Sequence, residues 1–179
     1  MTAHATPASI RRAGRMVLAA CLIMAASQTV AVAHARPGGD ELAWKSFSAA
    51  RMAAKESKRK VLVDVYTTWC GWCKKMDRDV YGNADVRAYL QEHFEVSKLD
   101  AESADTQTVD DAEHTGREIA TAMGVSSYPT TVFFSDSGEM ITAVPGYTSA
   151  EGFLQVLEYI HGEKYKTQSW NEFRSSKGK

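Results

Sequence analysis

Cysteine and proline are scarce in this chain of 179 residues, and no charge of one sign dominates it. It has three cysteines and four prolines, so it is neither a disulfide-rich scaffold nor a proline-rich linker. Its 21 basic residues are balanced by 22 acidic ones. That balance lacks the excess positive charge with which proteins bind nucleic acids or anionic membranes, so we expect no nucleic-acid partner.

Residues 1–35 lack acidic side chains and predict a secretory signal peptide. Three arginines precede an apolar stretch over residues 16–26, and small residues then lead to an Ala-x-Ala site. A basic start, a short apolar core and a small-residue cleavage site are typical of such leaders. We expect cleavage after Ala35 in preference to Ala33, which makes residues 36–179 a periplasmic or otherwise exported product.

Two alternatives for this leader stay open. Leu18-Ala19-Ala20-Cys21 resembles a lipoprotein cleavage box, in which Cys21 would carry a lipid anchor, although only five apolar residues separate Arg15 from Cys21. The stretch over residues 16–35 approaches the length of a membrane span, although polar residues dilute it. A lipoprotein and an uncleaved anchor are therefore the alternatives to a soluble exported product.

The exported product would keep only two cysteines, Cys70 and Cys73. They lie in Trp69-Cys70-Gly71-Trp72-Cys73, which follows the apolar run over residues 61–66. That run predicts a buried strand, and the cysteines then lie where a helix begins. A helix start favours the thiolate of the first cysteine, and the second lies one turn later, within reach for a disulfide. The pattern predicts thiol–disulfide exchange, in which Cys70 attacks and Cys73, the less exposed thiol, resolves the mixed disulfide.

Hydrophobic periodicity predicts alternating helices and strands along the rest of the chain. The predicted elements are a helix over 42–60, a strand over 61–66, a helix from 70 through 80, a helix over 85–93, a strand over 94–99, a helix over 117–123, a hairpin of strands over 131–134 and 140–144, and a helix ending at 161. Residues 100–113 contain six acidic and no basic residues, which predicts a solvated connection. The tail from 162 is polar and basic, with Tyr165, Trp170 and Phe173 as candidate anchors onto the body.

This order predicts an α/β fold with a mixed central sheet flanked by helices. With the Trp-Cys-Gly-Trp-Cys site, the sequence resembles the thioredoxin superfamily over residues 61–161, especially exported thioredoxin-like proteins. It is also similar to the C-terminal domain of the bacterial transmembrane thiol:disulfide interchange protein. We therefore expect a thioredoxin-like domain over 61–161, preceded by a flexible start and an extra helix over 36–60 and followed by a tail over 162–179.

Asp64 is a carboxylate inside an apolar strand, where ionisation is costly, so we expect its pKa to be raised. The resemblance implies that Asp64 accepts the proton of Cys73, and that Lys98 matches a lysine beside this aspartate. The alternatives are an aspartate that faces solvent at the strand end and a lysine that lies on the surface.

The resemblance also implies that Tyr128-Pro129 forms a cis-proline loop facing the dithiol, whose backbone pairs with an extended substrate segment. Trp72 stands where thioredoxin has proline, and Gly146 matches a glycine that admits substrate. The alternatives are a trans proline, a tryptophan that only covers the disulfide and a simple turn glycine. The predicted substrate-contacting residues are Trp69, Gly71, Trp72, Tyr128, Pro129 and Gly146.

The sequence therefore predicts an exported protein-disulfide reductase that acts through Cys70 and Cys73, without an organic cofactor or a metal, as a monomer. The partners implied by the resemblance are disulfide-containing exported proteins and a membrane electron-relay thiol:disulfide protein. One alternative is a disulfide oxidase or isomerase. Another is a non-catalytic module that holds a partner or a metal, although His93, His114 and His161 show no paired ligand spacing.

Overall fold

A computed structural model describes residues 41–177. The predicted signal peptide, Cys21 and the flexible start over residues 36–40 lie outside the described residues. The α-helices are α1 (Phe47–Ser57), α2 (Gly71–Met76), α3 (Ala84–His93), α4 (Gly116–Ala122), α5 (Ala150–His161) and α6 (Trp170–Lys177). The strands are β1 (Lys60–Tyr66), β2 (Phe94–Asp100), β3 (Thr106–Val109), β4 (Ala112–Thr115), β5 (Thr130–Phe134) and β6 (Met140–Pro145). A π-helical turn, η1 (Asp77–Tyr81), follows α2, and a 3₁₀ turn, η2 (Lys164–Lys166), follows α5.

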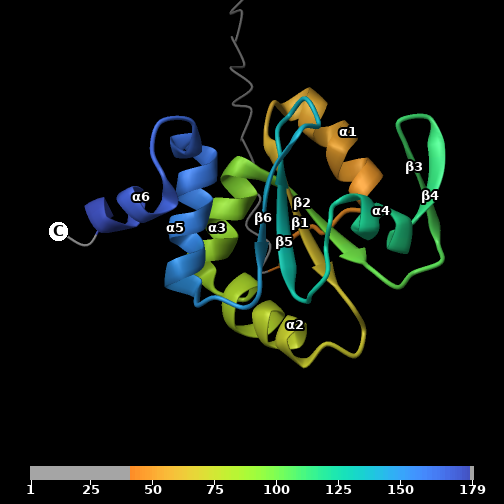
Figure 1. The fold of residues 1–179 in the computed structure, drawn as a ribbon, viewed down its shortest axis with the longest axis horizontal. Coiled ribbons are helices and arrows are strands. Elements are labelled where there is room, and N and C mark those ends of the chain that lie inside the picture. Colours follow the sequence, from red (N-terminus) through yellow and green to blue (C-terminus); the bar gives the residue numbers. More distant parts are fainter. Residues whose placement is uncertain (1–40, 178–179) are drawn as a thin grey trace, which may run out of the picture. The chain divides into compact units, whose positions relative to one another are not determined.

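Four of the strands form a mixed sheet in the order β2-β1-β5-β6 (Figure 1). β1 and β2 run parallel, whereas β5 is antiparallel to both β1 and β6. Helices α1 and α4 cover one face of the sheet, and α3 and α5 cover the other. This arrangement is the α/β fold that the sequence predicts.

The central strand β1 is buried on both faces, which explains its continuous apolar sequence. Side chains alternate along a strand, so Val61, Val63 and Val65 pack in the core under α1 and α4. Leu62 packs in the opposite core, among side chains of α3 and α5. Asp64 shares the face of Leu62, which brings its carboxyl into an apolar layer.

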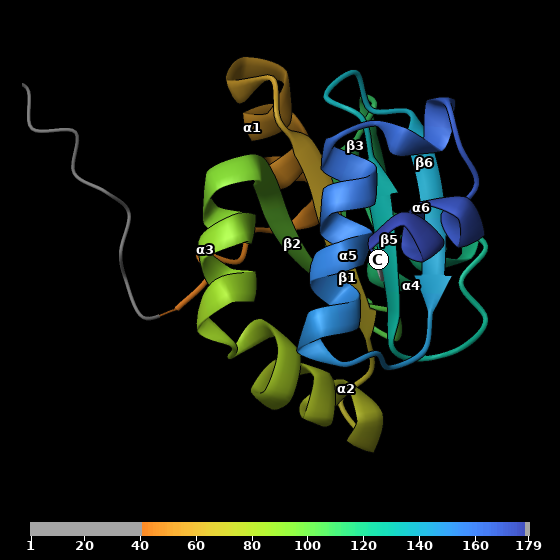
Figure 2. The same ribbon diagram turned by 90° about the vertical axis from the view of Figure 1, so that its left-hand side faces the viewer.

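The helix predicted to run from Cys70 through Val80 is present, but it consists of two parts. α2 is followed directly by η1, whose wider turns begin at Asp77. Val80 and Tyr81 of η1 are buried against the α5 side of the sheet. Figure 2 shows α2 lying across the end of the sheet where β1 finishes, and this position places its first residues beside the loops at that end.

Residues 100–113 are largely exposed, as predicted for a solvated connection, but the expectation of a loop there is wrong. Strands β3 and β4 form a separate two-stranded hairpin. The hairpin is fixed to α1, because the Ser48 N–H donates to Gln107 Oε1 (3.2 Å) and Arg51 pairs with Asp110 (2.9 Å). Its strands are polar on both faces, so no hydrophobic alternation revealed them in the sequence.

Two other differences concern the ends of the chain's helical segments. The first helix begins at Phe47 rather than at 42, because the Ser46 side chain caps it by accepting from the Ala49 N–H. The C-terminal tail contains the helix α6, which the sequence did not predict. The predicted anchors do contact α5: the rings of Tyr165, Trp170 and Phe173 lie 6.4, 5.3 and 5.2 Å from the ring of Tyr159.

Candidate functional site

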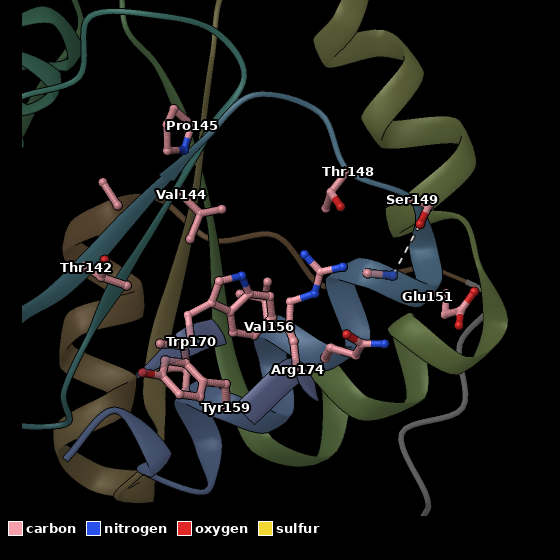
Figure 3. Close-up of a pocket in the computed structure, with 14 residues that line it drawn as sticks. Thr142, Val144, Pro145, Thr148, Ser149, Glu151, Val156, Tyr159, Trp170 and Arg174 are labelled. Atoms are coloured by element: carbon pink, nitrogen blue, oxygen red, sulfur yellow. Dashed lines mark hydrogen bonds between the residues drawn. The ribbon is translucent and has the colours of Figure 1, made fainter. Parts of the chain in front are cut away.

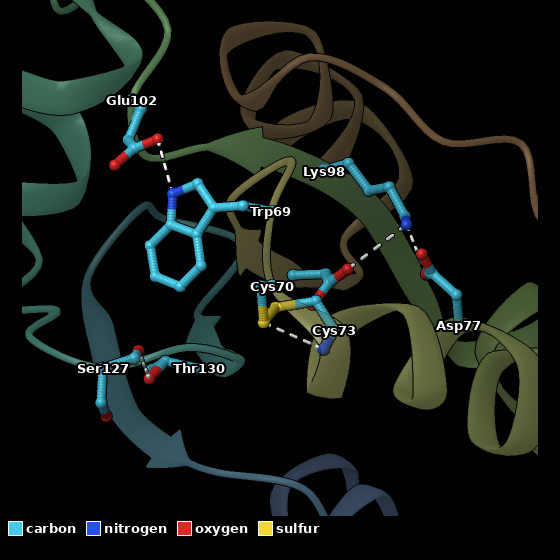
Figure 4. Close-up of a disulfide and its surroundings, with 9 residues drawn as sticks. Trp69, Cys70, Cys73, Asp77, Lys98, Glu102, Ser127 and Thr130 are labelled. Atoms are coloured by element: carbon cyan, nitrogen blue, oxygen red, sulfur yellow. Dashed lines mark hydrogen bonds and ion pairs between the residues drawn. A yellow bond between two sulfur atoms is a disulfide. The ribbon is translucent and has the colours of Figure 1, made fainter.

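The two cysteines of the motif form a disulfide at the start of α2 (Figure 4). The Cα atoms of Cys70 and Cys73 are 5.3 Å apart, within the usual range for a disulfide. Cys70 is the N-cap of α2, and its Sγ accepts a hydrogen bond of 3.0 Å from the Cys73 N–H. A free thiolate at Cys70 would receive the same donor and would face the positive end of the helix.

The structure corrects one expectation about the two thiols. Cys73 was expected to be less exposed than Cys70, but each residue is 4% exposed. Their difference is one of position, because Cys70 lies at the cap whereas Cys73 lies within the first turn of α2. Burial of the whole residue therefore does not identify which thiol attacks.

The Tyr128–Pro129 peptide bond is cis, as the resemblance implied. The loop after β6 is held to this proline, since the Gly146 N–H donates to the Pro129 carbonyl (2.7 Å). Gly146 has φ +84°, a conformation that glycine adopts readily, and a Cβ there would have no neighbour within 4 Å. The loops before β5 and after β6 are thereby joined at the end of the sheet where β1 leads into the motif.

Two aromatic pairs join the cysteine motif to these loops. Trp69 is 66% exposed, and its ring lies 6.1 Å from that of Tyr128 in an edge-to-face arrangement. The Trp69 indole N–H donates to Glu102 Oε2 (2.9 Å), which fixes the ring as Figure 4 shows. Trp72 is 58% exposed, and its ring lies 5.5 Å from that of Tyr147. Exposed apolar rings on both sides of a disulfide create a surface suited to polypeptide side chains.

Sequence analysis missed Tyr147 and Glu102 as parts of this surface. The Lys75 ammonium lies 5.2 Å from the centre of the Tyr147 ring, so α2 contacts this tyrosine through two side chains, those of Trp72 and Lys75. Tyr147 directly follows Gly146, which was a signal available in the sequence. Glu102 had none, because nothing in the acidic connection separated it from its neighbours. At Gly71, a predicted substrate contact, an added Cβ would meet no atom within 4 Å, so the motif is open there.

Asp64 lies beneath α2 and η1 and is 2% exposed, so the alternative of a solvent-facing carboxylate is wrong. Burial raises the pKa of Asp64 from 3.8 to about 7, while the neighbouring Lys98 opposes the rise. Lys98 Nζ is 3.5 Å from Asp64 Oδ2, which confirms the predicted proximity of these two residues. The other oxygen, Oδ1, has no hydrogen-bond partner among the described residues. A carboxyl in this environment can gain or lose a proton near neutral pH.

Two residues of η1 complete the surroundings of Asp64, and sequence analysis had assigned neither. Asp77 accepts a hydrogen bond from the Lys98 ammonium. The Tyr81 hydroxyl is hydrogen-bonded to Thr131 Oγ1 (3.3 Å), and Thr131 is the register neighbour of Asp64 on β5. The buried carboxyl therefore has polar groups beside it from β2, β5 and η1.

A cavity of about 640 Å³ lies between β6, α5 and α6 and is lined in part by Val156, Tyr159 and Trp170 (Figure 3). Neither cysteine lines this cavity. Within residues 41–177, no three His, Cys, Asp or Glu side chains are grouped so as to hold a metal ion. His93 and His161 stack with ring centres 4.0 Å apart, whereas His114 lies on β4. None of the helices over 41–177 has the length and apolar character needed to cross a bilayer.

Comparison with known proteins agrees with this geometry. Residues 47–161 match the model of the family described as "Thioredoxin-like domain". The chain is 34% identical over 111 residues to thiol:disulfide interchange protein DsbD of Ralstonia nicotianae, covering 62% of this chain and 17% of that protein. It is 28% identical over 106 residues to protein disulfide-isomerase 1 of Dictyostelium discoideum, covering 59% of this chain and 25% of that protein. Among solved structures, a thioredoxin-fold protein from Helicobacter pylori has 25% identity and a TM-score of 0.58, covering 68% of this chain and 80% of that one. The chain thus spans only 17–25% of the length of these two curated relatives.

Proposed function

Since the chain belongs to the thioredoxin-like domain family, we propose that it is an exported thiol:disulfide oxidoreductase that reduces the disulfides of other exported proteins. The observation that carries this proposal is the Cys70–Cys73 disulfide at the start of α2, beside the cis Tyr128–Pro129 loop. A lone bridge that closes so short a loop adds little stability by restricting the unfolded chain, which argues against a structural role.

In the proposed reaction, the Cys70 thiolate of the reduced protein attacks one sulfur of a substrate disulfide. A bond forms between Cys70 Sγ and that sulfur, and the other substrate sulfur leaves as a thiolate that takes a proton from water. Cys73 then passes its proton to the Asp64 carboxylate and attacks Cys70 Sγ. The bond between Cys70 Sγ and the substrate sulfur breaks, and that sulfur leaves as a thiolate that takes a proton from water. Two electrons move from the protein to the substrate, and the protein is left with the Cys70–Cys73 disulfide.

The surrounding loops would hold the substrate during these steps. The backbone of Tyr128 precedes the cis proline and offers polar groups to an extended segment. Trp69 and Trp72 would contact side chains on either side of the substrate cysteine, because both rings are largely exposed. Gly146 and Gly71 would let the substrate backbone approach, since neither position carries a side chain.

Continued turnover needs a dithiol that reduces the Cys70–Cys73 disulfide again. Following the resemblance, we propose that this dithiol belongs to a membrane electron-relay thiol:disulfide protein. Similarity of this chain to DsbD of Ralstonia nicotianae, a thiol:disulfide interchange protein, supports exchange between dithiols of this kind. We also propose that residues 1–35 act as the export signal and that the product is a monomer. N-terminal sequencing of the secreted protein should find Arg36 as its first residue. A start at Cys21 with a bound lipid would instead establish the lipoprotein alternative.

The reduction potential tests the proposed direction of electron flow. Residues 36–179 are equilibrated with defined glutathione buffers, and the reduced fraction is measured by alkylation of thiols. A potential near that of thioredoxin, about −270 mV, supports the reductase, whereas a value near that of DsbA, about −120 mV, contradicts it.

Similarity to a protein disulfide-isomerase favours a second candidate, an isomerase that rearranges wrong disulfides. The assay uses the protein with Cys70 and Cys73 reduced, because exchange begins with a free Cys70 thiolate. Reactivation of an enzyme with scrambled disulfides by a catalytic amount of this reduced protein, without further reductant, would support that candidate. Trapping of mixed disulfides with substrate proteins tests the roles of the two cysteines in the reductase and in the isomerase alike. Cys73→Ser should accumulate mixed disulfides through Cys70, and Cys70→Ser, the matched control, should accumulate far fewer. Equal amounts from both variants would contradict the assigned roles. Full biological activity of the double variant Cys70→Ser/Cys73→Ser would instead indicate a non-catalytic binding module.

A further inference from the structure

The Lys98 ammonium lies between two carboxylates rather than beside one. It donates a hydrogen bond to Asp77 Oδ1, whereas its distance to Asp64 Oδ2 is 3.5 Å, longer than an ordinary charge-assisted hydrogen bond. The carboxylate that holds the ammonium is thus the one that the proposed reaction does not use. Figure 4 shows Lys98 directed toward Asp77 at α2 and η1.

Two aromatic rings help to hold the ammonium in this position. Lys98 Nζ lies 5.1 Å from the centre of the Trp44 ring and 5.2 Å from that of the Tyr66 ring. Both distances allow cation–π attraction. The amine is therefore confined among Trp44, Tyr66 and Asp77, and its approach to Asp64 is limited by these contacts.

The two carboxylates differ sharply in their contact with water. Asp64 is 2% exposed, whereas the side chain of Asp77 is 43% exposed and that of Lys98 is 24% exposed. Asp77 and Lys98 line a cavity of about 490 Å³ together with Trp44 and Tyr81. Asp77 can therefore keep its charge at little cost. It can attract the Lys98 ammonium away from Asp64 and toward the solvent-exposed side of the site.

We propose that Asp77 is a positioning residue of the dithiol site, which shares the Lys98 ammonium with Asp64 and so limits how strongly Lys98 favours the charged form of Asp64. The electrostatic part of this inference is independent of the reaction, whereas its kinetic consequence rests on the proposed function. The other titratable groups near Asp64 are Tyr66 on β1 and Tyr81 on η1, and Glu41 and Arg87 line the same cavity.

Sharing has a direct consequence for the buried carboxyl. Lys98 forms ion pairs with Asp64 and Asp77. Without the Asp77 carboxylate, it would keep only the pair with Asp64 and would move toward that carboxyl. The charged form of Asp64 would gain a closer cation and would also lose the repulsion of a nearby anion. Both changes lower the pH at which Asp64 titrates, and both make it a weaker base toward Cys73.

The first test is the titration of Asp64 in the oxidised full chain, followed by NMR of ¹³C-labelled aspartate carboxyl groups. In the oxidised form neither Cys70 nor Cys73 titrates, so the Asp64 signal is not coupled to a thiol. Asp77→Asn should lower the midpoint by about half a pH unit or more. Asp77→Glu should restore most of the difference. The matched control is Asp79→Asn, which removes a carboxylate of η1 paired with Lys75 and Arg78, and it should leave the midpoint unchanged.

A double-mutant comparison separates sharing from simple repulsion between carboxylates. Lys98→Met should raise the Asp64 midpoint. In the Lys98→Met background, the shift caused by Asp77→Asn should fall to less than half of its size in the normal chain. An equal shift in both backgrounds would overturn the proposal, because Asp77 would then act only through its own charge. No shift in either background would overturn it as well.

Kinetics then connect the shared ammonium to the reaction. The acidic limb of the pH–rate profile for reduction of a peptide disulfide should move to lower pH in Asp77→Asn, and Asp79→Asn should not move it. A chain without any exchange activity but with the expected Asp64 titrations would overturn the proposed function and leave the sharing supported. Normal exchange activity with an unshifted Asp64 midpoint in Asp77→Asn would overturn the sharing alone.

Discussion

Trp72 and Tyr147 pack their rings 5.5 Å apart at an angle of 43°, and this contact joins one of the two residues between the cysteines to the loop between β6 and α5. The pair lies beside the disulfide, and Lys75 also contacts the tyrosine ring. Aromatic pairs of this kind contribute about 0.5–1.5 kcal/mol beyond the area that they bury. The loop after β6 is therefore held against the start of α2 by side chains outside the cysteine pair.

Tyr147→Ala should weaken binding of polypeptide substrates. Loss of the tyrosine ring frees Trp72 and removes apolar surface, so KM for a peptide disulfide should rise about 2- to 10-fold, with a smaller change in kcat. Steady-state reduction of a fluorescent peptide disulfide measures both constants. Met52→Ala, which truncates an exposed apolar residue on α1, is the control and should change neither. A large loss in kcat with unchanged KM would contradict a binding role.

Asp64→Asn should stabilise the protein at neutral and alkaline pH. The folded state raises the pKa of Asp64 from 3.8 to about 7, so the folded protein binds this proton more tightly than the unfolded chain does. The stability of the normal protein therefore decreases as the pH rises from 3.8 to about 7, and the loss is complete above that range. Removing the ionisable group should increase the free energy of unfolding by about 2–4 kcal/mol at pH 8.

Urea unfolding of the oxidised protein at about pH 4 and about pH 8 checks this sign. The gain from Asp64→Asn should be large at the higher pH and close to zero at the lower one. Asp111→Asn, in the exposed turn of the β3–β4 hairpin, should change stability at neither pH. A gain of the same size at both pH values would attribute the effect to packing rather than to ionisation. The same Asn variant should slow resolution of the mixed disulfide, if Asp64 accepts the proton of Cys73.

Gly146→Ala should cost stability for a purely conformational reason. A Cβ at this position would have no neighbour within 4 Å, but φ is +84°, which is unfavourable for alanine by about 1–2 kcal/mol. Gly71→Ala is a matched control, since its Cβ would also meet no atom and its φ is not positive. Thermal unfolding should therefore show a lower Tm for Gly146→Ala and little change for Gly71→Ala. Equal effects would show that the positive φ is not the cause.

His161→Gln should reduce the loss of stability in mild acid. Burial and the neighbouring His93 and Lys60 lower the pKa of His161 below 6.5, while Glu92 opposes them. A lowered histidine pKa means that the unfolded chain binds the proton first, so stability falls as the pH drops below 6.5. Urea midpoints at about pH 7.5 and about pH 5.5 should differ less in the variant than in the normal protein. A difference between the two pH values as large in the variant as in the normal protein would contradict this role of His161.

Much of the fold could be predicted because its elements are amphipathic or continuously apolar. The central strand β1 and the helix α5 have strong hydrophobic patterns. The bounds of β1 were predicted to within one residue, and α5 ends at 161, as predicted. The β3–β4 hairpin could not be predicted, because its short strands are mostly polar and lack an apolar alternation, and because the side chains that hold it to α1, such as Arg51 with Asp110, lie far apart in the sequence. The helix α6 was missed although its Trp170 and Phe173 were predicted as anchors, because two apolar residues in a short polar segment do not define a helical face.

The sequence by itself determined the chemistry of the site. Two cysteines two residues apart, after an apolar strand, specify a dithiol at a helix start, and an aspartate within that strand specifies a costly buried carboxyl. Only the tertiary structure decided what surrounds these groups, because Tyr147, Glu102 and Asp77 reach the site from separate segments. It is this assembly that places one ammonium between two carboxylates and two aromatic pairs beside one disulfide. Such arrangements depend on distances in space, and a linear pattern of residues does not contain them.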